Sequence, residues 1–172
     1  MSLIDVMKNR RSIRKYTDED IPEEKLEKII QAGLLAPTSR NRKPCNFMVV
    51  KDRETLNKLS KSKRTGSKML KGANTAIVVY ADSDKADTWI EDSSIALSYM
   101  NLMAEEQAIG SCWVQIHLRK TGINKNSEDY VRELFDLDGK YRIVGILSLG
   151  VPDKKPDGHD LSDLDYDKVE YV

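Results

Sequence analysis

The fold is decided by residues 85–110, which read KADTWIEDSSIALSYMNLMAEEQAIG. No glycine or proline interrupts this stretch before Gly110, so nothing within it breaks a helix. Gly110 then offers the backbone freedom with which helices commonly end. The apolar residues recur at spacings that let them share one broad buried face: Ile90, Ala96, Leu97, Met100, Met103 and Ala104. The stretch predicts one long central helix closed by Gly110.

Shorter helices and strands are predicted on both sides of this helix. Apolar residues at helical spacing, preceded by capping residues or proline, predict helices from Ser2 to before Arg10, from Pro22 to before Pro37, at 52–59 and at 127–135. Apolar and β-branched runs predict strands at 46–50, 75–81, 111–116 and 141–149. Strands that alternate with helices are typical of layered α/β proteins. We therefore expect a three-layer α/β arrangement in a single domain that covers residues 1–172.

The composition excludes several classes of protein. The chain has 172 residues, of which 40% are apolar, and this is enough for a real core in one domain. Lys plus Arg and Asp plus Glu both number 28, so no overall field attracts nucleic acid or an anionic membrane. The longest apolar stretches, 75–81 and 143–149, are far shorter than the roughly 20 residues that span a bilayer. The N-terminus carries no secretion signal, so we expect a cytoplasmic protein. Its two cysteines, Cys45 and Cys112, should stay as thiols and suggest no metal site.

The densest chemical feature is the segment Lys8-Asn9-Arg10-Arg11-Ser12-Ile13-Arg14-Lys15-Tyr16. Arginine offers a planar fork of donors for phosphate oxygens, and Ser12 adds a hydroxyl donor. In an extended segment, alternation would put Arg10, Ser12 and Arg14 on one side. The segment is either a phosphate site or a set of solvated cations at the end of a helix, which charge runs usually are.

A polar break follows the second predicted helix, at Ala36-Pro37-Thr38-Ser39-Arg40-Asn41-Arg42-Lys43-Pro44. Thr38 and Ser39 can donate or accept hydrogen bonds, and Asn41 carries both an amide donor and an acceptor. Such a loop can surround a polar ligand. Proline, serine and asparagine also dominate ordinary turns, so a plain turn is the alternative.

Two strand ends carry further features. Gly110-Ser111-Cys112-Trp113-Val114-Gln115 is a tight turn into a strand, in which Trp113 is by default a core residue. Leu147-Ser148-Leu149-Gly150-Val151-Pro152 is an apolar strand that ends in glycine and proline. A flat ring could approach the backbone at Gly150, or the strand could simply terminate there.

Taken together and in this order, these four segments resemble the FMN-dependent nitroreductase family, whose members open with an R-x-S-x-R-type segment followed by a P-S-S-x-N-x-Q-P-type loop. The resemblance runs from about Leu3 to Pro152. It implies a nitroreductase-like α/β (α+β) fold, with a central mixed sheet flanked by helices, and FMN as the cofactor. The cofactor-binding residues that it implies are Arg10, Arg11, Ser12, Arg14, Pro37, Thr38, Ser39, Asn41, Trp113, Val114, Gln115 and Gly150.

The resemblance also implies roles for these residues. Arg10, Arg11 and Ser12 would hold the FMN phosphate, and Arg14 would approach the N1 and O2 edge of the flavin. Arg14 would there act as an electrostatic stabiliser of the charge on the reduced ring. No catalytic side chain is implied, because the cofactor itself accepts and donates hydride at N5.

A homodimer with FMN at its interface is implied as well. The loop at 37–41 would reach the flavin partly from the second subunit, while the backbone of 113–115 would face the flavin and Gly150 would allow a close approach near the phosphate. Residues 151–172 would form a C-terminal extension that packs on the partner subunit. Its late apolar residues need such cover: Tyr166, Val169, Tyr171 and Val172.

The implied activity is the transfer of hydride equivalents from NAD(P)H to a nitroaromatic, a quinone or another conjugated acceptor by a ping-pong mechanism. The sequence departs from the family at Lys43-Pro44-Cys45, where Gln-Pro-Trp is common, and at Asp157, where many members have a cation for the phosphate. Lys154 or Lys155 could replace that cation. Lys68 is similar to a family lysine that reaches the pyrimidine ring.

Two other classes of function stay open. Covalent catalysis by Cys45 or Cys112 with His117 or His159 would need a third group to orient the histidine, and none is evident. A protein of the same fold could also bind FMN for storage or redox sensing without catalysis.

Overall fold

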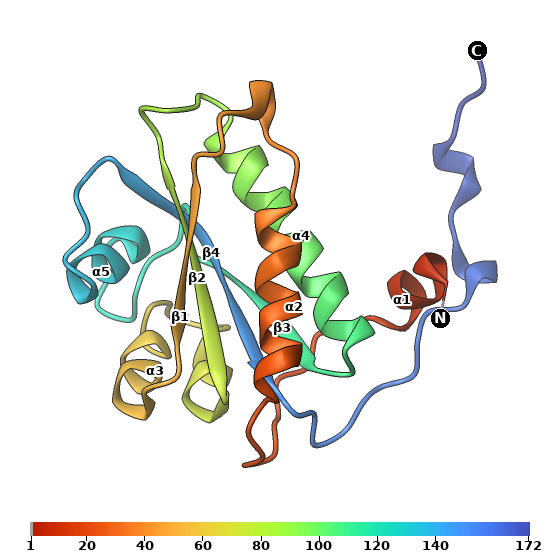
Figure 1. Ribbon diagram of the computed structural model, residues 1–172, viewed down its shortest axis with the longest axis horizontal. Helices are drawn as coiled ribbons and strands as arrows, with labels where there is room; N and C mark the ends of the chain where they lie inside the picture. The colour runs from red at the N-terminus through yellow and green to blue at the C-terminus, as the bar shows by residue number, and fades with distance from the viewer. Residues whose placement is uncertain (1) are drawn as a thin grey trace.

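Four strands form one sheet between two layers of helices in the computed structural model, which describes residues 2–172 (Figure 1). Helices α2 and α4 cover one face of the sheet, and α3 and α5 cover the other (Figure 1). The elements in chain order are α1 (Leu3–Asn9), α2 (Glu23–Leu34), η1 (Ser39–Asn41), β1 (Cys45–Val50), α3 (Arg53–Leu59), η2 (Lys68–Gly72), β2 (Thr75–Asp82), α4 (Trp89–Glu106), β3 (Gly110–Gln115), α5 (Ser127–Leu134), β4 (Tyr141–Gly150), η3 (Leu161–Asp163) and η4 (Tyr166–Lys168).

Helix α4 confirms the long central helix but is shorter at both ends than predicted. It begins at Trp89, because Lys85 instead closes a turn by donating its N–H to the carbonyl oxygen of Asp82, 3.2 Å away. It ends at Glu106, and the left-handed residue beyond it is Ala108, with φ of 57°, rather than Gly110. Gly110 serves another purpose, since a Cβ there would lie 2.9 Å from Cγ2 of Ile13.

The sheet has the order β1-β2-β4-β3 and is antiparallel throughout its named strands. Cys45 pairs with Ala81 at one edge of the sheet, and Trp113 pairs with Leu147 at the other. The α+β fold class is confirmed. The mixed sheet, however, is reduced to one parallel bridge among the described residues, between Ser12 and Ser111.

Each face of the sheet carries its own apolar core. Ile29 of α2 and Leu97 and Met100 of α4 are fully buried on one face. Leu56 of α3 and Val131 of α5 are fully buried on the other. Strand β4 is buried from Ile143 to Gly150 because helices cover both of its faces, which explains its continuous apolar run.

The edges of the sheet are formed by β1 and β3. The segment between α1 and α2 runs beside β3, and the tail after β4 passes α1 and then leads away from the rest of the chain (Figure 1). The outer side of β3 is therefore open beyond its first residues.

Among residues 2–172, no helix has both the length and the apolar character that a membrane crossing requires.

Candidate functional site

The basic segment predicted to bind phosphate is fastened to the start of β3. Ile13 donates its N–H to the carbonyl oxygen of Ser111 at 2.9 Å, and its side chain is buried. Because side chains alternate along extended backbone, Ser12 and Arg14 point outward, and both are exposed. The Arg14 guanidinium lies 3.4 Å from the carbonyl oxygen of Ser12. The segment therefore presents a hydroxyl and a guanidinium on the outer side of β3.

The same edge offers unpaired backbone amides. In a strand, the N–H and C=O of one residue point the same way, and the direction alternates from residue to residue. The carbonyl of Ser111 points outward to Ile13, whereas the N–H of Ile116 points inward to Val144 on β4, at 2.9 Å. Trp113 and Gln115 therefore direct their N–H groups to the open edge, where they can bind a ligand. Val114 points its backbone N–H to β4 and its side chain into the core, so its N–H does not face the open edge.

A cationic hollow lies beside Arg14. It has a volume of about 520 Å³ and is lined by Arg14, Lys15, Tyr16, Lys68, Met69, Lys71, Gly72 and Asp153. Four cations thus face one carboxylate. Lys68, which was only a secondary candidate from the sequence, is brought to the same hollow as Arg14.

Cys112 lies behind this edge and is a poor nucleophile. Burial raises the pKa of its thiol, although Arg14, a hydrogen bond with Ser12 and Arg10 oppose that rise. Burial also raises the pKa of the Cys45 thiol. Within residues 2–172 neither cysteine is hydrogen-bonded to a histidine. Reactive cysteines have lowered pKa values, so the geometry does not favour covalent catalysis by a thiol.

The loop at 37–41 lies at the other edge of the sheet. The N–H of Ser39 donates to Oδ1 of Asp92 in the first turn of α4, at 2.9 Å, and Oγ1 of Thr38 accepts from the N–H of Lys43, at 3.1 Å. The loop leads into β1, which three inter-strand spacings of about 4.8 Å, or roughly 14 Å in all, separate from β3. One chain therefore does not bring Asn41 and Arg14 into the same site.

Three other residues of the expected flavin site contact other parts of the same chain. Arg11 donates to the carbonyl oxygen of Asp157 at 2.6 Å. The indole N–H of Trp113 donates to Oε1 of Gln115 at 3.0 Å, and its ring packs on the core below α4. A Cβ at Gly150 would lie 2.5 Å from Oδ1 of Asn74 and 2.6 Å from Cγ of Tyr16. The side of Gly150 on which a Cβ would stand is thus filled by protein.

The tail lysines proposed as substitutes for a phosphate-binding cation are in different situations. Lys155 forms an ion pair with the buried Glu105. Lys154 is exposed, and no ion pair of the described residues involves it. Lys155 is therefore not available without breaking that pair.

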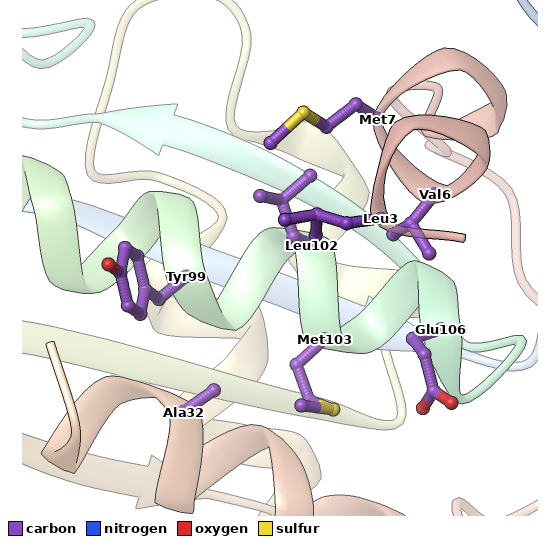
Figure 2. A pocket seen from close by; sticks show the side chains of 8 residues that line it. All are labelled: Leu3, Val6, Met7, Ala32, Tyr99, Leu102, Met103 and Glu106. Atoms are coloured by element: carbon purple, nitrogen blue, oxygen red, sulfur yellow. The ribbon is translucent and has the colours of Figure 1, made fainter. Parts of the chain in front are cut away.

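An apolar hollow of about 340 Å³ lies between α1 and α4 (Figure 2). Figure 2 shows Leu3, Val6 and Met7 of α1 beside Leu102 of α4, with Met103 next to Leu102 and Tyr99 further along the same helix. Glu106 is its one charged residue, and it contains no cation for a phosphate. Leu3 is 65% exposed and Tyr99 is 42% exposed, so this surface is uncovered in a single chain.

Sequence reasoning missed a second cationic group, at the far end of β3. Lys63 and Arg64 on one loop meet Arg119 and Lys120 on another around a cleft of about 270 Å³. The available signal was a pair of short basic runs, at 61–64 and 119–120, more than fifty residues apart. Without the fold, neither run shows that the other lies beside it.

Comparison with known proteins finds close relatives over most of the chain. A model of the nitroreductase family matches residues 7–66 and 60–151. A protein of Archaeoglobus fulgidus, provisionally named NADH dehydrogenase/NAD(P)H nitroreductase, is 37% identical over 158 residues, which are 90% of this chain and 87% of that protein. A solved FMN-dependent nitroreductase from Clostridium difficile is 44% identical, with 98% of each chain covered and a TM-score of 0.94. Every residue of the expected flavin site lies inside the range that the family model matches.

Proposed function

This chain belongs to the nitroreductase family of oxidoreductases, and we propose that it holds FMN along the open edge of β3 and passes hydride equivalents from NAD(P)H to a flat conjugated acceptor. Nitroaromatics and quinones are the acceptor classes that we propose, with donor and acceptor reacting in turn by a ping-pong mechanism. The observation that carries the proposal is the hydrogen bond from the N–H of Ile13 to the carbonyl oxygen of Ser111. It puts Ser12, Arg14 and the outward N–H groups of β3 on one edge.

The donor set on this edge fits FMN. A phosphomonoester needs cations and hydroxyl donors, which Arg10 and Ser12 supply. A flavin ring needs hydrogen-bond donors along one edge, and the N–H groups of Trp113 and Gln115 provide them. Arg14 and Lys68 add positive charge beside the hollow. The relatives named above include an FMN-dependent enzyme, which supports the same cofactor here.

The protein's part in the reaction would be electrostatic and positional. Bound FMN would supply the hydride chemistry at N5. Arg14 would stabilise the negative charge of the reduced cofactor through a charge that is in place before the reaction. The N–H of Trp113 or Gln115 would hold the reacting edge in register with β3. We assign no side chain as a proton donor or acceptor.

We further propose that the working form is a homodimer whose site is shared between subunits. The separation of Asn41 and Arg14 on opposite edges of the sheet supports this, because a flavin on one edge can meet the loop at 37–41 only from a second copy. The uncovered apolar hollow between α1 and α4 (Figure 2) supplies surface for such a contact. The exposed end of the tail supplies more.

Steady-state oxidation of NADH and NADPH with menadione or a nitrofuran tests the activity. We expect a yellow protein that releases FMN on denaturation and gives parallel lines in double-reciprocal plots. Chromatography of the released flavin identifies the cofactor. FAD, or no flavin after incubation with excess FMN, would contradict the cofactor. A flavinated protein that oxidises neither nucleotide would instead be a storage or redox-sensing protein.

A further inference from the structure

The cleft between Lys63, Arg64, Arg119 and Lys120 is built by two loops that the backbone holds together. The N–H of Arg64 donates to the carbonyl oxygen of Lys120 at 2.9 Å, and Arg119 is held in a turn by its own N–H to the carbonyl oxygen of Ile116, at 3.1 Å. Thr65 and Asn124 complete the lining with a hydroxyl and an amide. We call this hollow the distal cleft, since it lies at the end of β3 away from Arg10.

No carboxylate balances these four cations. Many other cations of the chain pair with an acid, as Lys58 does with Glu54 and Arg142 with Glu128. Within residues 2–172, no Asp or Glu lies within ion-pair distance of the four cations of the distal cleft. Burial and the charge of Arg119 lower the pKa of Lys63, which shows that the charges act on one another. Four uncompensated cations in a chain of zero net charge indicate that an anion is their counterpart.

The distal cleft adjoins the edge of β3 along which we propose that FMN binds. The charge of Lys63 acts on the thiol of Cys112. The charge of Arg14 acts on the same thiol, and Ser12 forms a hydrogen bond with it. Arg119 follows Trp113 by six residues, so no more than about 20 Å of chain separates them. A molecule that places a reacting ring beside Trp113 can therefore place a distant phosphate in the cleft.

We propose that the distal cleft binds the 2′-phosphate of the reduced dinucleotide, so that the enzyme uses NADPH in preference to NADH. The proposal rests on the proposed function, which supplies the dinucleotide. A phosphomonoester carries close to two charges on one group with three acceptor oxygens. Each phosphorus of a pyrophosphate diester carries a single charge. A compact group of four cations therefore matches the 2′-phosphate better than it matches any group of NADH.

Two sources of phosphate have to be distinguished, because FMN carries a phosphomonoester too. The test uses the FMN-saturated protein, which we titrate with adenosine 2′,5′-bisphosphate and with 5′-AMP by calorimetry. We expect the bisphosphate to bind more tightly. In the double variant Arg64→Gln, Lys120→Gln, its advantage should fall on the order of 10-fold or more for each charge-assisted bond lost. Lys25→Gln, Lys28→Gln on α2, where Lys28 is exposed and Lys25 is half-buried, is the matched control and should change nothing.

The kinetic arm measures kcat/KM for both nucleotides. We expect NADPH to be favoured by the parent protein, and the double variant to lose this preference while its NADH value and its affinity for FMN stay unchanged. Equal use of the two nucleotides by the parent protein would overturn the proposal and leave the proposed function intact. Loss of FMN affinity in the double variant would overturn it as well, because the cleft would then serve the flavin phosphate. Oxidation of neither nucleotide would overturn the proposed function, whereas tight binding of the bisphosphate would still support the cleft.

Discussion

Arg10 and Arg14 lie on the same short segment, but we propose different roles for them, and their substitution should separate two effects. Arg10→Ala should weaken FMN binding by about 1.5–3 kcal/mol, the value of one charge-assisted hydrogen bond. Arg14→Ala should leave more of the affinity but shift the flavin midpoint potential to a more negative value, because the reduced ring loses a neighbouring cation. Titration of each apoprotein with FMN and a reductive titration provide the two readings. If both variants bind FMN normally and keep the parental potential, neither arginine has its assigned role.

The structure gives Gly150 a packing role that a substitution can test. A methyl group at this position would press against Asn74 and the Tyr16 ring, so Gly150→Ala should destabilise the fold by about 1–3 kcal/mol. Urea unfolding measures the loss. Gly139→Ala is the control, because nothing lies within 4 Å of a Cβ at that position. An unchanged stability combined with weaker FMN binding would restore the flavin as the reason for this glycine.

At the scale of single residues, the sequence predicts the features that depend only on residues nearby in the chain. The alternation that turns Ser12 and Arg14 outward is local, so it could be read from the sequence. The packing of Gly150 against Tyr16 could not, because the two residues meet only after β4 has been placed beside the first loop. The distal cleft was missed for the same reason.

Helix α5 is joined to β3 and β4 through a single buried carboxylate. Glu128 has a side chain that is only 3% exposed. It accepts hydrogen bonds from Nδ1 of His117 at 2.7 Å, from Nε of Arg142 at 2.9 Å and from the N–H of Ile143 at 3.1 Å. Burial acts to raise the pKa of Glu128, but these bonds outweigh it and hold the pKa below its ordinary value of 4.5. The end of the β3 edge, along which we propose that FMN binds, therefore depends on an ionised Glu128.

The pH dependence of stability follows from this lowered pKa. The folded protein binds fewer protons than the unfolded chain in this range, so the stabilisation is complete above pH 4.5 and is lost as the pH falls through the folded-state pKa. Glu128→Gln should cost about 3 kcal/mol at neutral pH and should flatten the acid loss of stability. Urea unfolding at a series of pH values checks both effects. Glu54→Gln, in the exposed pair with Lys58, is the control and should cost less than about 1 kcal/mol. Parallel acid profiles for the parent and Glu128→Gln would contradict this role.

The helices and strands themselves were largely predictable, whereas their directions were not. Periodicity and capping indicate where α2, α3, α5 and the four strands lie, and the structure confirms each of them. Alternating strands and helices suggest a parallel component in a sheet. Here β4, the last strand, inserts between β2 and β3 and makes every neighbouring pair antiparallel. Local patterns carry no information on which strands become neighbours.

In the whole molecule, the two halves of the expected flavin site lie on opposite edges of the sheet. The sequence motifs indicate both halves but not that one chain keeps them apart. The separation across β2 and β4 supports our proposal that the site is shared between two copies, if FMN binds at the β3 edge. Assembly and cofactor binding should therefore be coupled.

Removal of residues 161–172 tests this coupling. The first part of the tail is anchored to its own chain, since His159 donates its N–H to the carbonyl oxygen of Lys8 at 2.9 Å. Beyond it every residue is exposed, and Tyr166 and Tyr171 are 68% and 94% exposed. At roughly 25 cal/mol for each Å² of apolar surface, burial of this segment on a second copy would stabilise the dimer appreciably.

The truncated protein should keep its fold, because the anchor at His159 remains, but it should dimerise more weakly and bind FMN less tightly than the full chain. Sedimentation velocity and flavin fluorescence on the same sample give the two readings, and circular dichroism confirms the fold. The two losses should occur together over a dilution series, since in the proposed shared site the loop at 37–41 reaches the flavin only in the dimer. A truncated protein that stays dimeric and fully flavinated would show that the tail covers its own subunit. A full-length monomer that binds FMN tightly would overturn the shared site itself.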